Sequence, residues 1–408
     1  MNVFKLTGNI QHYDWGTRNE NAYIPKLLNI KTEPNKPYAE YWLGVHPSLP
    51  SKIIYKNETI LLSDFIEKEK DIIGTKFYEK YIKLPFLLKV LSIEQPLSIQ
   101  AHPNKQQAAV LHLKDPNNYP DDNHKPEIAI AIDKLEALVG LKSIEKLNEL
   151  FVIFPEIKTY LNHFINVESH SPSDIFKAYV SNSQNNPEYA KLTDFIYNKI
   201  KSENDKLSNY YKFCYEKYGK YDVGLLCLYL LNFVELKEGE AVFLEAGIPH
   251  AYLTGNIVEC MANSDNVVRI GLTPKFKDIA TLIKIFKVTD DLLLIKPVSE
   301  VFDYITEGFG AKSQLQRPSS LHRPSQIENS KNAFNIEFNI RRVFSKSQVE
   351  FNSYDKFYIL LNIGNSFALR NFNEEIIVNK GEAYLIGVNN DLKFIPTTDL
   401  QIFLVSYN

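Results

Sequence analysis

Four polar side chains lie in strand-like segments where they could hold one metal ion. In the segment 98–102 (SIQAH), residues two apart share one face of an extended strand, so Gln100 and His102 point the same way. Glu127 heads the apolar run EIAIAI, where a carboxylate needs a partner because an unpaired buried charge is costly. His250 ends the run GEAVFLEAGIPH. Two imidazoles, one carboxylate and one amide oxygen, with no thiolate nearby in the sequence, form a donor set that suits zinc.

The prediction rests on the combination of these residues, because a single histidine on a strand more often has a structural role. Six of the nine histidines are interpreted as structural: His12, His46, His112, His163, His170 and His322. Motifs for dinucleotides, P-loops and serine hydrolases are absent from the sequence.

A second chemical signal is an isolated arginine in the segment 264–275 (SDNVVRIGLTPK). The chain has 39 lysines and 7 arginines, and Arg269 is the only arginine between Arg18 and Arg317. The planar guanidinium suits a site that binds a phosphate or stabilises an oxyanion. The alternative interpretation is a buried structural ion pair, with Asp265 as the partner.

Composition limits the class of protein. The 408 residues carry a formal net charge of −3, from 46 Lys and Arg against 49 Asp and Glu, which argues against a nucleic-acid partner. The three cysteines are too few and too scattered for a disulfide framework. No apolar run approaches the ~18 residues of a membrane span, and the first residues lack the apolar core of a signal peptide. We expect a soluble, cytoplasmic protein of several domains with no membrane partner.

The elements that must position these residues are short strands interrupted by a helical block. Strand-like runs occupy much of 84–141 and 237–275, whereas apolar residues three and four apart predict helices through 142–236. Further helices are expected within 61–80, after Asn104, which can cap a helix with Gln107 three residues on, and at about 277–286. Residues 311–334 are polar and suit a linker, and short strands recur from 335 to the end.

The segments 238–244 (EGEAVFL) and 380–386 (KGEAYLI) resemble each other, with a glycine turn before a strand in both. If they are a repeat, the chain contains two related β domains. The first copy is followed by Gly-Ile-Pro-His and the second by Gly-Val-Asn-Asn, so only the first keeps a histidine.

Together these residues resemble a known family, the type I mannose-6-phosphate isomerases (phosphomannose isomerases), which are zinc enzymes of the cupin superfamily. The resembling segments are YDWG at 13–16, YAEYWLG at 38–44, LPFLLKVL at 84–91, SIQAHPNK at 98–105, NHKPE at 123–127, GIPHAYL at 247–253 and SDNVVRIGLTPK at 264–275. The chain departs from the family pattern at Ile248 and Ile270, neither of which falls on a ligand.

The resemblance implies a mainly β protein with helices, built from two cupin-type jelly-roll domains and a helical insertion. The expected divisions are residues 1–141 with 237–300 as a discontinuous zinc-binding domain, 142–236 as the insertion, and 301–408 as a second cupin-like domain without metal. We expect one zinc ion per chain and a monomer.

The resemblance also implies roles for individual residues. The implied zinc ligands are Gln100, His102, Glu127 and His250, and Arg269 falls on the catalytic arginine. Further pocket positions are Lys125, Glu259, Asp265, Lys275, Trp15, Glu40, Lys89 and Ser98. Phosphate contact is expected from Lys89, Lys275 and Ser98. The proton-transferring base stays open among Glu259, Lys125 and His124.

The implied reaction interconverts mannose 6-phosphate and fructose 6-phosphate through a cis-enediol, in mannose and GDP-mannose metabolism, so the expected partner is a small phosphosugar. Two alternatives from other classes are a non-catalytic sugar-binding cupin and another cupin metalloenzyme, such as an iron oxygenase. The glutamine among the implied ligands argues against iron, since those enzymes use histidine-rich or two-histidine-one-carboxylate sites.

Overall fold

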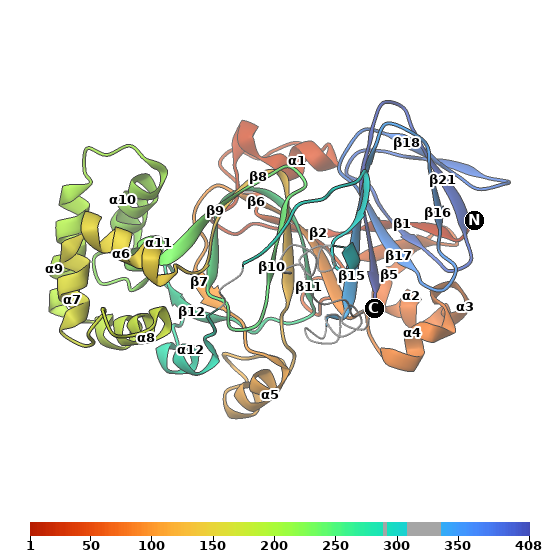
Figure 1. The fold of residues 1–408 in the computed structure, drawn as a ribbon. Coiled ribbons are helices and arrows are strands. Elements are labelled where there is room, and N and C mark those ends of the chain that lie inside the picture. The colour runs from red at the N-terminus through yellow and green to blue at the C-terminus, as the bar shows by residue number, and fades with distance from the viewer. Residues whose placement is uncertain (289–291, 308–335) are drawn as a thin grey trace, which may run out of the picture.

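The computed structural model describes residues 1–288, 292–307 and 336–408. The expected linker at 311–334 lies outside the described residues. The protein is mostly β, with the helices of residues 144–230 at one end, the strands in the middle and at the other end, and shorter helices around the strands (Figure 1). No helix within the described ranges combines the length and the apolar character needed to cross a membrane.

A ten-stranded sheet carries half of the predicted site residues. Its path runs through β13 (Leu293–Ile295), β10 (Ala241–Leu244), β8 (Glu127–Leu141), β11 (His250–Ala262), β6 (Phe86–Ile93), β3 (Glu40–Leu43) and β2 (Asn9–Gln11). Off this path, β9 (Leu231–Lys237) pairs with β8, and β7 (Ile99–Ala101) pairs with β11 and with β12 (Val268–Gly271). The sheet therefore brings together segments that lie far apart in the sequence.

An eight-stranded sheet contains the C-terminal strands. Its order is β14 (Val301–Asp303), β15 (Phe338–Ser345), β22 (Leu400–Tyr407), β17 (Tyr358–Asn362), β20 (Ala383–Ile386), β1 (Val3–Thr7), β4 (Lys52–Tyr55) and β5 (Glu58–Leu61). A four-stranded sheet follows the order β16 (Val349–Asn352), β21 (Asp391–Pro396), β18 (Phe367–Arg370) and β19 (Glu375–Val378). Because β1, β4 and β5 extend the C-terminal sheet, this sheet crosses the predicted boundary between 1–141 and 301–408.

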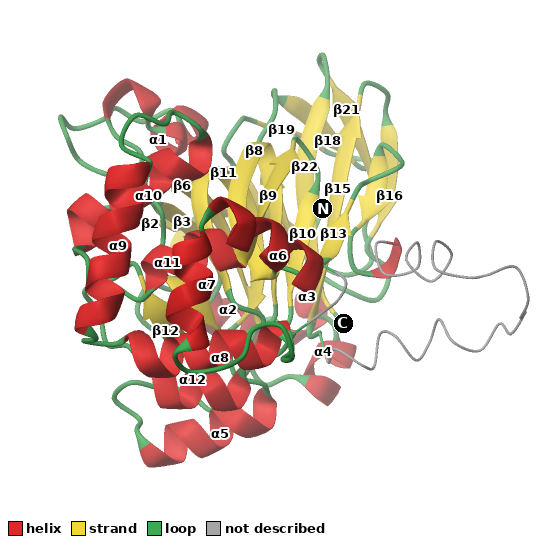
Figure 2. Cartoon of the chain, turned by 60° about the vertical axis from the view of Figure 1, so that its left-hand side comes forward, coloured by secondary structure: helices red, strands yellow, loops and turns green. Residues whose placement is uncertain are grey.

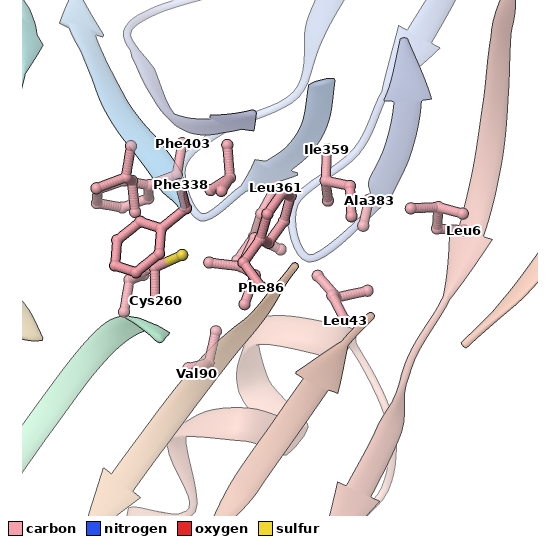
Figure 3. Packing of buried hydrophobic residues seen from close by; sticks show 14 of the residues in the cluster. Leu6, Leu43, Phe86, Val90, Cys260, Phe338, Ile359, Leu361, Ala383 and Phe403 are labelled. Carbon is pink, nitrogen blue, oxygen red and sulfur yellow. The ribbon is translucent and has the colours of Figure 1, made fainter. Parts of the chain in front are cut away.

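One hydrophobic core joins the two larger sheets. Phe86 and Cys260 from the ten-stranded sheet belong to the same buried cluster as Phe338, Leu361 and Phe403 from the eight-stranded sheet (Figure 3). All five side chains are fully buried. The site-bearing sheet is thus supported from one side by the C-terminal strands.

The helical block covers the opposite end of the molecule (Figures 1 and 2). Its helices are α6 (Ile144–Ile153), α7 (Pro155–Asn162), α8 (Pro172–Ser183), α9 (Pro187–Lys199), α10 (Lys206–Tyr218) and α11 (Gly224–Leu230). The predicted block 142–236 therefore ends in a strand and not in a helix, because residues 231–237 pair with β8 as β9. The other helices are α1 (Tyr23–Leu28), α2 (Leu62–Lys68), α3 (Lys70–Ile73), α4 (Thr75–Lys80), α5 (Lys105–Lys114) and α12 (Ile279–Ile285), with a short 3₁₀ turn at Asn19–Asn21.

The two similar sequence segments occupy similar backbone positions. Gly239 and Gly381 both have positive φ, at +77° and +79°, and each precedes a fully buried strand, β10 and β20. A residue with a side chain rarely adopts this backbone conformation, which explains the glycine in both copies. Each strand is an inner strand of its own sheet.

Candidate active site

Two histidines and one glutamate from three segments of the ten-stranded sheet lie close together. His102 follows β7, Glu127 begins β8 and His250 begins β11. Each side chain offers one atom, and the three atoms lie within 4.8 Å of one another. His102 Nε2 is 3.4 Å and His250 Nε2 is 3.5 Å from Glu127 Oε2. All three residues are buried, at 1% exposure or less.

Backbone carbonyls fix the orientation of both rings. His102 Nδ1 lies 2.9 Å from the carbonyl oxygen of Asn266, and His250 Nδ1 lies 2.9 Å from that of Ile248. A neutral imidazole that donates from Nδ1 leaves its Nε2 lone pair free to bind a metal. Within the described chain, His102 Nε2 and Glu127 Oε2 have no hydrogen-bond partner. Orphaned buried donor atoms that face one point fit a bound metal ion.

The electrostatics of the three residues favour the forms that bind metal. Burial lowers the pKa of His102 to about 4, although Glu127 opposes this effect. Burial alone would raise the pKa of Glu127, but the charge of Lys125 and the neighbouring His102 and His250 outweigh it and hold this pKa well below its usual range. Neutral imidazole and ionised carboxylate are the ligand forms that a divalent cation requires.

Gln100 lies beside this cluster because it pairs in register with His250 across β7 and β11. Its amide Nε2 is 3.5 Å from His250 Nε2, and Ser98 Oγ lies 3.4 Å from its Oε1. Rotating the terminal amide exchanges its nitrogen and oxygen, which have nearly the same shape. Gln100 can therefore present an oxygen to an ion held by the three other residues.

A cavity of about 660 Å³ opens in front of the cluster. Eleven of the fourteen predicted site residues line it: Trp15, Glu40, Lys89, Ser98, Gln100, Lys125, Glu127, Glu259, Asp265, Arg269 and Lys275. His102 and His250 lie buried in the metal-binding cluster behind this lining. The predicted set is thus gathered around one space, with the exception of His124.

His124 points away from the cavity. Its Nε2 is 2.7 Å from Glu337 Oε1, and it does not line the cavity. The neighbouring Lys125 does line it, and its Nζ lies 2.8 Å from Glu127 Oε1. Successive residues of an extended segment point to opposite sides, which explains the difference between the two.

Lys89 and Glu259 form a buried ion pair deep in the cavity, because they face each other in the pairing of β6 with β11. Glu40 Oε2 lies 3.8 Å from the same ammonium. Burial alone would lower the pKa of Lys89, but Glu259 and Glu40 outweigh it and raise this pKa. Burial raises the pKa of Glu259, and Lys89 offsets only part of the effect.

Arg269 and Lys275 differ from Lys89 and Lys125 in their surroundings. Neither of them forms an ion pair with a carboxylate anywhere in the described ranges. Arg269 pairs in register with Gln100 across β12 and β7, which places it beside the metal-binding cluster. The structural alternative, an Arg269–Asp265 ion pair, does not form, because Asp265 Oδ2 lies 3.0 Å from His46 Nε2 instead. Arg269 is available to a bound anion.

Sequence reasoning missed several residues of the site. Tyr252 lines the cavity, two residues beyond His250 on the same strand face, so the period-two pattern could have found it. The interpretation of His46 as purely structural is incomplete, because its hydrogen bond lowers the pKa of Asp265. Lys217 and Tyr218 reach the cavity from α10 in the helical block, and no local pattern signals this.

Known proteins are similar to this chain in sequence. Residues 3–144 match the catalytic domain of type I phosphomannose isomerase. Mannose-6-phosphate isomerase of Ogataea parapolymorpha is 38% identical over 307 residues, covering 69% of this chain and 71% of that protein. The human mannose-6-phosphate isomerase is 37% identical over 311 residues, covering 70% and 73%.

Solved structures are similar over the whole chain. A zinc-bound mannose 6-phosphate isomerase superposes with a TM-score of 0.80 at 27% identity, covering 100% of both chains. The Salmonella typhimurium enzyme, solved with its substrate and zinc bound, gives the same values.

The catalytic-domain match, the curated relatives and the substrate-bound structure identify the class of this protein as an isomerase, whose buried His-Glu-His group lies at the cavity. The chain belongs to the mannose-6-phosphate isomerase family. The predicted family and the predicted class of enzyme are confirmed.

Proposed function

We propose that this enzyme interconverts D-mannose 6-phosphate and D-fructose 6-phosphate through a cis-enediol, with one zinc ion per chain. The observation that carries the proposal is the convergence of three buried ligand atoms on a cavity that also holds an unpaired arginine. The relatives with bound zinc and bound substrate support the choice of metal and substrate. The product feeds mannose and GDP-mannose metabolism.

The residues that hold the metal in this proposal are Gln100, His102, Glu127 and His250. Zinc bound there supplies a Lewis acid for the sugar oxygens at C1 and C2. The three buried ligands and the adjacent amide form a mixed nitrogen and oxygen donor set, which fits zinc.

Glu259 is the residue that we assign to proton transfer. It lines the cavity, and burial raises its pKa, as a carboxylate that takes a proton from carbon requires. In the forward reaction it removes the proton from C2 and returns it to C1, while a hydroxyl proton moves between O2 and O1. Lys125 is the second choice, since its ammonium is bonded to Glu127 and is less free to exchange a proton.

Arg269 stabilises the negative charge of the enediolate or binds the phosphate, because it is a planar cation without a carboxylate partner among the residues described. Lys275 and Ser98 line the same cavity and serve as phosphate contacts. Lys89 keeps Glu259 and Glu40 in place by its ion pairs. Asp265, held by His46, and Trp15 complete the walls.

For the architecture we propose two cupin-type jelly-roll domains and a helical insertion. The repeated glycine turn before β10 and β20 supports a relationship between the two β parts. The divisions are 1–141 with 237–300, 142–236, and 301–408, with β1, β4 and β5 contributed to the C-terminal sheet. Action as a monomer in the cytoplasm stays a prediction from the sequence.

The test is conversion of mannose 6-phosphate to fructose 6-phosphate by the purified protein, before and after a chelator and after zinc is restored. We expect turnover that is lost with the metal and regained with zinc. Glu259→Gln keeps the shape of the side chain and removes the base, so it should bind zinc and lose turnover. Absence of turnover in the fully zinc-loaded protein would overturn the proposal in favour of a non-catalytic sugar-binding protein.

A further inference from the structure

The mouth of the cavity carries a cation from the helical block that no signal in the sequence singled out. We propose that Lys217, in the last turn of α10, binds the phosphate group of the substrate and so contributes to selection of phosphorylated sugars. The inference rests on the proposed function and assigns a substrate-binding role to the helical block.

Lys217 is held at the cavity rim by a contact between distant parts of the chain. Its Nζ donates a hydrogen bond of 2.6 Å to Gln95 Oε1, in the turn between β6 and β7. The backbone N–H of Gln95 donates to the carbonyl of Trp15, which lines the cavity. Lys217 and Tyr218 line the cavity themselves.

The position of α10 is built into the packing of the block. Buried Glu136 on β8 accepts hydrogen bonds from Lys206 Nζ at 2.7 Å and Tyr210 Oη at 2.6 Å, both from the first half of α10. The helix ends at Gly219, whose φ of +79° turns the chain away. Because these contacts anchor the first half of α10, they fix the position of Lys217 in its last turn.

The distribution of charge within the cavity determines where a phosphate can bind. Near the metal-binding cluster the buried lysines are already occupied, because Lys89 is paired with Glu259 and Lys125 with Glu127. A phosphate monoester carries about −1.5 to −2 charges at neutral pH, so it binds best to cations that are not already paired with a carboxylate.

Three cations that line the cavity have no carboxylate partner in the part of the chain that the structure describes: Arg269, Lys275 and Lys217. Burial and the nearby Arg269 lower the pKa of Lys275, and Glu40 opposes this effect only in part. Among the described residues, the side chain that accepts a hydrogen bond from Lys217 is the neutral amide of Gln95. The charge of Lys217 is therefore available to a bound anion.

The sugar must place C1 and C2 at the metal end for the reaction. Its phosphate, on C6, then lies at the opposite end of the carbon chain, toward the mouth. Lys217 is therefore the contribution of the helical block to a phosphate site whose other cation, Lys275, comes from the segment that follows β12.

The experiment compares the zinc-loaded wild type with Lys217→Ala, Lys217→Arg and Gln95→Ala, using mannose 6-phosphate as substrate and inorganic phosphate as competitive inhibitor. We expect Lys217→Ala to raise both KM and the phosphate Ki about three- to tenfold, with a smaller effect on kcat. Lys217→Arg keeps the charge and should restore most of the loss. Gln95→Ala removes the hydrogen bond but keeps the ammonium, and should leave the phosphate Ki within about twofold of wild type.

Lys212→Ala is the matched control, because Lys212 is on the same helix and its Nζ donates to the carbonyl of Glu203 and not toward the cavity. It should leave KM and Ki at wild-type values. Wild-type KM and Ki in Lys217→Ala would overturn the inference. An equal rise of KM and Ki in Lys217→Ala and Gln95→Ala would also overturn it, because it would show that the Lys217–Gln95 hydrogen bond has only a structural role. If the wild type shows no turnover, the proposed function fails, and calorimetric phosphate binding to the same variants still decides the role of Lys217.

Discussion

The carbonyl oxygens of Ile248 and Asn266 determine which atoms of the two buried imidazoles face the cavity. Each carbonyl accepts from Nδ1, so each Nε2 is directed at Glu127. The imidazoles are oriented by the backbone before any ion binds, and little side-chain freedom is lost on metal binding. At the scale of single residues, the site is therefore preorganised.

Acid should destabilise the metal-free protein through His102. Its pKa in the folded protein is about 4, below the ~6.5 of an unfolded chain. Between these values the unfolded chain binds more protons, so the free energy of unfolding falls as the pH drops from about 6.5 to about 4. The pKa of Glu127 is also lowered, so its contribution to the free energy of unfolding is likewise lost as the pH falls. Urea denaturation of metal-free protein at pH 7 and pH 5 measures the effect, which His102→Asn should reduce; an unchanged pH dependence in that variant would contradict it.

Replacement of Arg269 by alanine should reduce kcat/KM by about 10²–10³, the cost of removing one preorganised group that stabilises an oxyanion. The zinc content should stay at the wild-type level, because Arg269 is not among the clustered ligands. Steady-state kinetics and metal analysis check both points. Arg370→Ala is the control, since Arg370 is exposed on β18 and pairs with Glu375; a similar loss of activity there would argue against a specific role for Arg269.

At the scale of elements, features that depend only on residues close together in the sequence could be predicted. The predicted cap of α5 is confirmed: Asn104 Oδ1 accepts from the N–H of Gln107, and Gln107 Oε1 accepts from the N–H of Asn104, both at 2.9 Å. The helix follows directly after the segment that carries His102. A local rule of this kind needs no knowledge of the rest of the fold.

Asn104→Ala should destabilise α5 by about 1 kcal/mol, because it removes an N-cap. Only Ala108 of this helix is buried, so packing compensates little. Hydrogen exchange should show faster exchange of the α5 amides. Gln106→Ala changes an exposed residue of the same turn and should leave the exchange rates as they are; equal rates in the two variants would show that the cap is not stabilising.

Elements whose identity depends on distant partners were harder to predict. Residues 231–236 continue an apolar helical pattern, yet they form β9 because β8 offers a strand to pair with. The expected helical stretch within 61–80 is broken into α2, α3 and α4. Gly74, with φ +89°, separates the last two, and a Cβ there would lie 2.7 Å from Val388 Cγ1. Tertiary contact overrides local periodicity in both places.

The same limit applies to the site. Gln100 and His102 could be assigned to one strand face from their spacing, and the resemblance placed them with Glu127 and His250. Lys217 and His46 could not be found in this way, because their neighbours in space, Gln95 and Asp265, lie far away in the sequence. Strand pairing and helix docking create these contacts, and neither is encoded in a short segment.

At the scale of the whole molecule, the shared core makes the two large sheets one stable unit. Phe86→Ala should lower the free energy of unfolding by about 3–5 kcal/mol, since it leaves a cavity between the sheets. Tryptophan fluorescence reports on Trp15 and Trp42, and far-UV circular dichroism reports on the whole chain; both should give one coincident transition. Phe372→Ala, at a fully exposed side chain, should change stability by less than about 0.5 kcal/mol. Two separate transitions would show that the sheets unfold independently.

The pairing of β1 with β20 has a consequence for synthesis on the ribosome. Leu6 can meet Ile53 of β4 early, but its other neighbour, Ala383, is translated much later. The ten-stranded sheet uses only residues from 9 to 295, so all its strands are available while β20 is still missing. One edge of β1 therefore stays open on the nascent chain until β20 has been translated, which happens after all the strands of the ten-stranded sheet.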